Sequence, residues 1–93
     1  MIWTQQAEQD YYSQVDFLLE HWDDSIAEKF VDRVFEVIDL IIQNPRLYAQ
    51  TDYLNVRKAV LDRHISLFYR LDSQKVFLLR FWPNQQNPDE LYL

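Results

Sequence analysis

Glycine and cysteine are both absent from the 93 residues of this chain. Without glycine, phosphate-cradling loops of the GxGxxG and Walker types are excluded, because their backbone angles and close approach to phosphate require it. Without cysteine, disulfides, thiolate metal sites and a cysteine nucleophile are excluded. We therefore predict no cofactor. No metal site is predicted either, because His21 and His64 lie in different predicted elements with no third ligand in register. We expect the turns to be formed by Asp, Asn, Ser and Pro.

Long apolar runs are also missing. No stretch of about 18 apolar residues is present, and the N-terminal residues have neither the basic region nor the apolar region of a signal peptide. Hydrophobic residues nevertheless make up 48% of the chain and aromatic residues 16%, so residues 1–93 can bury the core of one domain. We expect a soluble, cytoplasmic, single-domain protein with no membrane partner.

Charge is unevenly distributed along the chain. The net charge of −6 argues against generic binding to nucleic acid. Residues 1–44 carry ten acidic side chains against two basic ones, whereas residues 45–93 carry seven basic against five acidic. Six of the nine Lys and Arg residues fall between residues 57 and 80, so we expect the function to reside in the second half.

The first half predicts a helical hairpin. After a short β-prone segment at residues 1–3, Thr4 is a suitable N-cap, and apolar residues then recur at steps of three and four up to Trp22. Ser25 followed by Glu28 matches a capping box that would begin a second helix. That helix should end at Asn44, because the residue before a proline is pushed away from helical angles.

The second half predicts a loop over residues 45–52 and then three strands, over residues 54–61, 65–71 and 76–82. The last strand is largely apolar on both faces, which favours an interior position in the sheet. The order β-α-α-β-β-β indicates an α+β fold in which the helical hairpin packs on one face of a small, mainly antiparallel sheet. The opposite face is expected to carry cations, aromatic side chains and solvent.

Four segments of the sequence resemble the RelE/ParE toxin superfamily of bacterial toxin–antitoxin pairs. They are IWTQQAEQDY, FVDRVFEVIDLIIQNPRLY, VRKAVLDRHISLFYRL and LLRFWPNQQNPDEL. They are similar to the A-x-x-D start, the helix ending in x-x-P-x-x-Y/G, the R-K…H-x-x-x-Y-R strand pair and the closing F-x-x-x-R-Q-x-P of the ParE-like branch. The resemblance covers nearly the whole chain and implies the same β-α-α-β-β-β fold.

The resemblance implies a function and a partner. The chain would be the toxin component of a type II toxin–antitoxin system, of the plasmid-stabilisation kind, neutralised by a cognate antitoxin protein and acting on DNA gyrase. Two alternatives remain: a ribosome-dependent mRNA endoribonuclease of the RelE type, and a non-toxic interaction domain on the same fold. At two positions where the nucleases typically carry arginine, this chain has Ser66 and Gln85 instead. The loss of these two cations argues against an enzyme.

Candidate site residues concentrate in the strands. Cleavage of RNA requires cations that hold phosphate and a group that transfers a proton; the candidates for catalysis are Arg57, Arg70, Arg80 and Tyr92. A surface that binds an acidic partner or the target would draw on Arg57, Lys58, Arg63, His64, Arg70, Arg80 and Trp82. The alternative for the cations is pairing with neighbours such as Asp62 and Asp72, and the alternative for Trp82 is core packing.

Overall fold

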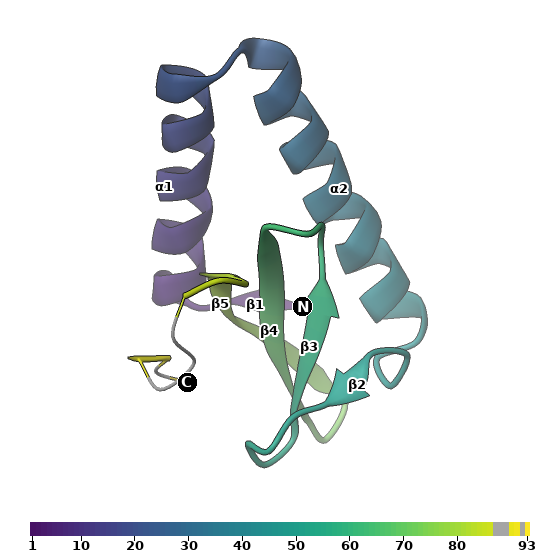
Figure 1. Cartoon of the computed structure of the whole chain (residues 1–93). Coiled ribbons are helices and arrows are strands. Elements are labelled where there is room, and N and C mark those ends of the chain that lie inside the picture. Colours follow the sequence, from purple (N-terminus) through teal and green to yellow (C-terminus); the bar gives the residue numbers. More distant parts are fainter. Residues whose placement is uncertain (87–89, 92) are drawn as a thin grey trace.

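The structure, a computed structural model, describes residues 1–86, 90, 91 and 93. Two helices lie beside a sheet, and the tip of the helical hairpin extends beyond the ends of the strands (Figure 1). The elements follow one another as β1 (Ile2–Trp3), α1 (Gln5–His21), α2 (Asp24–Gln43), β2 (Ala49–Gln50), β3 (Val56–Val60), β4 (Ile65–Asp72) and β5 (Lys75–Pro83). The predicted α+β fold is confirmed.

One strand differs from the prediction. The segment over residues 45–52, predicted as a loop, contains the short strand β2, which pairs antiparallel with β3. Two residues are too few to show the alternation by which strands are recognised in a sequence. The next strand begins at Val56 rather than at residue 54, and Leu54 is exposed.

Both helices begin at a capped N-terminus. Thr4 is the N-cap of α1, as predicted: its hydroxyl accepts a hydrogen bond from the Ala7 N–H at 3.2 Å and donates one to the Leu78 carbonyl at 2.7 Å. One side chain thereby satisfies a free helical N–H and fixes the start of α1 to strand β5.

The predicted capping box of the second helix is wrong. The N-cap of α2 is Asp23, whose carboxylate accepts from the Ile26 N–H at 3.0 Å and from the Ser25 hydroxyl at 2.8 Å. Asp caps a helix as well as Ser does, and its earlier position lets the helix begin at Asp24. The hydrogen bond from the Ser25 hydroxyl, and to a smaller extent the one from the Ile26 N–H, lowers the pKa of Asp23. The other end matches the prediction, with Asn44 as C-cap.

The sheet has the strand order β1-β5-β4-β3-β2, with β1 parallel to β5 and the other pairs antiparallel. Strand β5 therefore lies inside the sheet, as its apolar character predicts. The register between β4 and β5 shifts once: Phe68 lies opposite Arg80, but Tyr69 lies opposite Leu78. The additional residue on β5 is Leu79, which makes this a β-bulge.

The main core lies between the helices and one face of the sheet. Tyr69 is fully buried there, and its hydroxyl donates to the Pro45 carbonyl at 2.6 Å, which fixes the end of α2 to β4. Burial raises the pKa of Tyr69 above the ordinary 10.0. The largest other contributors are Leu67, Leu78, Val34, Val37 and Ile41.

The opposite face of the sheet, which we call the open face, is more apolar than predicted. Alternation along the strands, the register and the bulge place the following residues on it: Val56, Lys58, Val60, Ser66, Phe68, Arg70, Phe77, Leu79, Arg80 and Trp82. The expected aromatic side chains are present, but Leu91 and Leu93 pack against them in a second apolar cluster.

Among the described residues, no helix combines the length and apolarity that crossing a membrane requires.

Candidate partner-binding groove

The candidate residues named from the sequence do not form one surface. Arg57 lies on the face of the sheet that meets the helices, because it pairs with the buried Tyr69. Its guanidinium Nη1 donates to the carbonyls of Tyr48 at 2.7 Å and Arg46 at 3.3 Å. Arg57 therefore fixes the segment between α2 and β2 instead of facing a partner across the open face.

Arg80 is bound to the first helix. Its Nε and Nη2 donate to the two carboxylate oxygens of Asp10 at 2.7 Å and 3.2 Å, and the Phe81 N–H donates to the same carboxylate at 3.1 Å. The guanidinium also lies 4.9 Å from the ring of Trp82. This bidentate pairing with Asp10 gives the Arg80 guanidinium a structural role.

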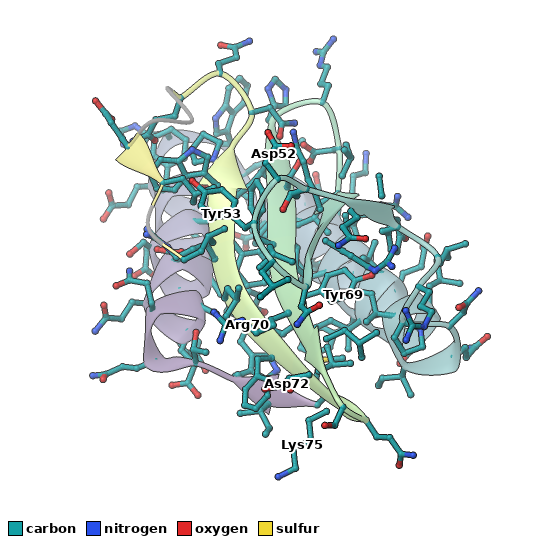
Figure 2. The ribbon with its side chains drawn as sticks, turned by 90° about the horizontal axis from the view of Figure 1, so that it is seen from below. Asp52, Tyr53, Tyr69, Arg70, Asp72 and Lys75 are labelled. Carbon is teal, nitrogen blue, oxygen red and sulfur yellow. The ribbon has the colours of Figure 1, made fainter. Side chains whose placement is uncertain are left out.

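Lys58 and Arg70 also lie on the open face, where Arg80 is opposite Phe68, and neither of the two forms an ion pair among the described residues. The Lys58 ammonium is 5.9 Å from the centre of the Phe68 ring. Arg70 is half-buried near the hairpin end of β4, and Asp72 and Lys75 lie beyond it at the β4–β5 hairpin (Figure 2). Within the part of the chain that the structure describes, the Arg70 side chain makes no hydrogen bond or ion pair.

The two positions at which the nucleases carry arginine, Ser66 and Gln85 in this chain, lie in different environments. Ser66 is fully buried, and its hydroxyl lies 2.6 Å from the side-chain oxygen of Asn84. Because Ser66 has no exposed surface, an arginine in its place would have to displace the side chains that cover it. Gln85 lies in the exposed turn after β5. Tyr92, the remaining catalytic candidate, falls outside the described residues.

Arg63 and His64 are brought together in the exposed turn between β3 and β4. The Arg63 Nε donates to the His64 Nε2 at 3.3 Å. The turn is held by Asp62, whose carboxylate accepts from the His64 N–H at 2.7 Å and the Ile65 N–H at 3.1 Å. This turn therefore presents one cation and one imidazole from a fixed backbone.

That turn forms one wall of a groove of ≈ 920 Å³, which we call the mouth groove. Its lining includes Trp22 and Ile26, near the tip of the helical hairpin, and that tip extends beyond the strands (Figure 1). The residues that line it come from both helices, from the β3–β4 turn and from the end of β5: Gln14, Phe17, Leu18, Trp22, Ile26, Lys29, Phe30, Arg33, Leu61, Asp62, Arg63, His64, Ile65, Pro83 and Gln85.

The mouth groove combines exposed apolar walls with a basic rim. Trp22 is 64% exposed and Phe17 49% exposed, with Ile26 beside them. The floor is the edge of the main core. Lys29, Arg33 and Arg63 supply positive charge. Arg33 is fixed by donating from Nε to the Leu61 carbonyl at 2.6 Å, and its Nη1 forms an ion pair with Glu36 at 2.5 Å that offsets part of its charge. Exposed large apolar side chains around a concavity are typical of a protein-binding site.

Sequence analysis missed the apolar half of this groove. Phe17 and Ile26 were not among the apolar positions predicted to face the core. Trp22 was placed at the end of the apolar face of the first helix, but it is 64% exposed. A signal was available, because a tryptophan and an isoleucine flanking the polar Asp23-Asp24-Ser25 segment have no local reason to be there. Among the described residues, no group of three or more His, Asp or Glu residues is arranged to hold a metal ion.

The fold is that of a small α+β domain with a groove between its helical hairpin and one end of the sheet. Residues 1–88 match the family model described as the ParE toxin of type II toxin–antitoxin system, parDE. The chain thus belongs to the ParE toxin family. A chain of the solved "Chromosomal ParDE TA system from P. aeruginosa" has the same fold, with a TM-score of 0.72 and 21% identity over 87% of this chain and 90% of that one. No curated protein matches the chain significantly.

Proposed function

We propose that this ParE-family toxin is neutralised by an antitoxin segment that docks in the mouth groove, and that its cellular target is DNA gyrase. The observation that carries the first part is the cluster of exposed Phe17, Trp22 and Ile26 around a groove of ≈ 920 Å³. The target follows from the resemblance to the gyrase-poisoning branch and implies action in the cytoplasm. No residue of this chain singles out gyrase.

The chemistry of the groove fits an amphipathic helix with acidic residues. Apolar side chains at steps of three and four along such a helix would fill the space between Trp22 and Phe17. Acidic side chains on its flanks would meet Lys29, Arg33 and Arg63, and would steer the encounter. Asp62 is the acidic residue in the lining. Its carboxylate accepts hydrogen bonds from the backbone N–H groups of His64 and Ile65, so it repels an acidic partner less than a carboxylate without donors would.

A nuclease is not proposed. Of the cations that could hold RNA, Arg57 and Arg80 are occupied in structural contacts, and Ser66 is buried where an arginine would be needed. Lys58 and Arg70 remain on the open face, beside apolar side chains. We propose that this pair, with the neighbouring Trp82, contributes to contact with the target.

The experiment expresses the chain alone and together with the small open reading frame encoded next to it. We expect growth arrest in the first case, rescue in the second, and a stable complex of the two proteins. Trp22→Ala should weaken the complex about tenfold or more, as expected for an exposed aromatic anchor, whereas Tyr12→Ala on the other side of α1 should not. Equal affinities of the two variants would exclude the mouth groove.

The gyrase assignment is tested separately. Purified toxin added to gyrase and plasmid should trap cleaved DNA, and the antitoxin should suppress this. In the same test, mRNA on translating ribosomes should remain intact after the toxin is added. Growth arrest with cleaved mRNA and unaffected gyrase would overturn the target while leaving the groove proposal in place.

A further inference from the structure

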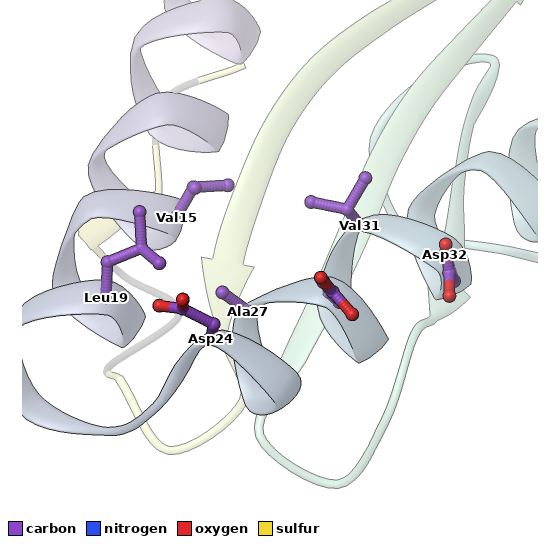
Figure 3. A pocket seen from close by; sticks show the side chains of 7 residues that line it. Val15, Leu19, Asp24, Ala27, Val31 and Asp32 are labelled. Carbon is purple, nitrogen blue, oxygen red and sulfur yellow. The ribbon is translucent and has the colours of Figure 1, made fainter.

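A second apolar strip lies on the other side of the helical hairpin. It surrounds a cavity of ≈ 400 Å³ between α1 and α2, where Val15 and Leu19 face Ala27 and Val31 (Figure 3). Tyr12 and Phe35 continue it at helical spacing, and both rings contact Tyr11. We call these six residues the outer seam. Tyr12 is 63% exposed, and Leu19 and Phe35 are each 47% exposed.

Acidic residues border the outer seam along α2. Asp24, Glu28 and Asp32 line the cavity at successive steps of four residues (Figure 3). Like charges at this spacing repel one another on a helix. Within the described ranges, none of the three makes an ion pair, and no Lys or Arg lines the cavity. The outer seam is thus an apolar strip, and the α2 carboxylates along its edge carry negative charge that no ion pair among the described residues balances.

The outer seam and the mouth groove are separate sites. They share no lining residue, since they use opposite flanks of the same two helices. Their charges are also opposite: the rim of the mouth groove carries Lys29, Arg33 and Arg63, whereas the edge of the outer seam is acidic. One partner segment cannot therefore complement both, and two partners of opposite charge can be bound together.

Charge decides which occupant the outer seam accepts. A second copy docked symmetrically on this face would bring a second set of the same carboxylates into the interface and no Lys or Arg from the cavity lining. Nucleic acid and anionic lipid are repelled in the same way. We propose that the outer seam binds an amphipathic helix that carries Lys or Arg beside its apolar stripe, as part of a partner protein. Its apolar residues enter the strip, and its cations relieve the repulsion along α2.

The test uses a fluorescent synthetic helix of about 18 residues, or five turns, patterned with Leu on one face and Lys on the other. Its binding to the full-length protein is followed by anisotropy at ~0.15 M salt. A peptide of the same composition in scrambled order measures plain charge attraction. We expect the amphipathic peptide to bind about tenfold tighter than the scrambled one.

Variants locate the binding. Glu28→Lys with Asp32→Lys should weaken binding of the amphipathic peptide about tenfold or more. Asp52→Lys with Asp72→Lys changes the net charge equally at exposed positions of the sheet half, away from the strip, and should weaken it less than about threefold. Circular dichroism verifies that each variant is folded. Equal losses in the two double variants, or equal affinity of the two peptides, would reduce the attraction to general charge and overturn the proposal.

NMR spectroscopy of the methyl groups provides a readout that does not depend on substitution. Addition of the amphipathic peptide should shift the methyl signals of Val15, Leu19 and Val31. The signals of Ile26 and Leu61, in the mouth groove, should remain in place. Shifts confined to the latter pair would show that the peptide occupies the mouth groove, which would overturn the assignment without bearing on antitoxin binding there.

Discussion

Asp10 and Arg80, 70 positions apart in the chain, join α1 to β5 through two hydrogen bonds of 2.7 Å and 3.2 Å. Their side chains are 14% and 15% exposed. The same carboxylate accepts the Phe81 N–H, beyond the point where the short strand β1 stops pairing with β5. These contacts explain the A-x-x-D motif near the N-terminus. Ala7 packs in the core, and Asp10 accepts a hydrogen bond at the edge of β5 that β1 leaves unpaired.

Loss of this contact should destabilise the fold. Asp10→Asn leaves a cation and a backbone N–H with weaker partners, so we expect the free energy of unfolding to fall by about 1.5–3 kcal/mol. Asp16→Asn, an exposed change on the same helix, should alter it by less than about 0.5 kcal/mol. Urea denaturation measures both. Arg80→Lys should also be destabilising, because an ammonium cannot reproduce the paired geometry. Equal stability of Asp10→Asn and Asp16→Asn would contradict this role.

The β4–β5 hairpin turns through a residue with an unfavourable backbone angle. Ser73 has φ of 56°, a left-handed conformation that costs non-glycine residues about 1–2 kcal/mol. Ser73→Gly should therefore stabilise the protein and raise its melting temperature by about 4–8 °C per kcal/mol gained. Ser73→Ala retains the Cβ and should bring no gain. A glycine variant that melts at or below the temperature of the unchanged protein would contradict the assignment of strain to this position.

Stability should decline in alkali through Tyr69. Its pKa is raised from 10.0, first of all by burial, so the folded chain retains the phenolic proton at a pH where the unfolded chain has lost it. The stabilisation is present below pH 10 and is lost as the pH rises through the folded pKa.

Tyr69→Phe should flatten this decline. At neutral pH it should cost about 1–3 kcal/mol, since the Pro45 carbonyl loses its donor. Tyr53→Phe, at an exposed position, serves as the control and should leave the profile unchanged. Chemical denaturation at a series of pH values provides the comparison. An alkaline decline as steep in Tyr69→Phe as in the unchanged protein would assign it to another group.

The basic rim of the mouth groove should control the rate at which the antitoxin associates. Arg63→Glu reverses a charge on the rim, so the association rate should fall by about tenfold, and by less at high salt. Arg46→Glu makes the same change in net charge at an exposed turn outside the groove and should have a smaller effect. Stopped-flow mixing measures both. Identical rates for the two variants would show that only overall charge matters.

The sequence predicted the order of the elements, the Thr4 cap and the interior position of β5, because periodicity and capping are local properties. It could not settle the start of α2, where Asp23 and Ser25 offer similar capping chemistry two positions apart. It could not orient Arg57 or Arg80 either. The start of β3 at Val56 decides which face Arg57 occupies, and the bulge at Leu79 changes the alternation beside Arg80.

The mouth groove depends on tertiary structure in a further way. Phe17, Trp22 and Ile26 are exposed because the helical hairpin extends beyond the β3–β4 turn (Figure 1). No local pattern records how far one element extends beyond another. The two residues that were predicted for binding and do lie in this groove, Arg63 and His64, lie there through the position of their turn.

Hydroxyl-radical footprinting of the toxin, free and in complex with its antitoxin, tests the central claim most directly. Exposed aromatic side chains report on the separate surfaces: Trp22 and Phe17 in the mouth groove, Tyr12 and Phe35 on the outer seam. We predict strong protection of Trp22 and Phe17, with Tyr12 and Phe35 as reactive as in the free toxin. Unchanged reactivity of Trp22 and Phe17 in a fully formed complex would contradict docking in the mouth groove.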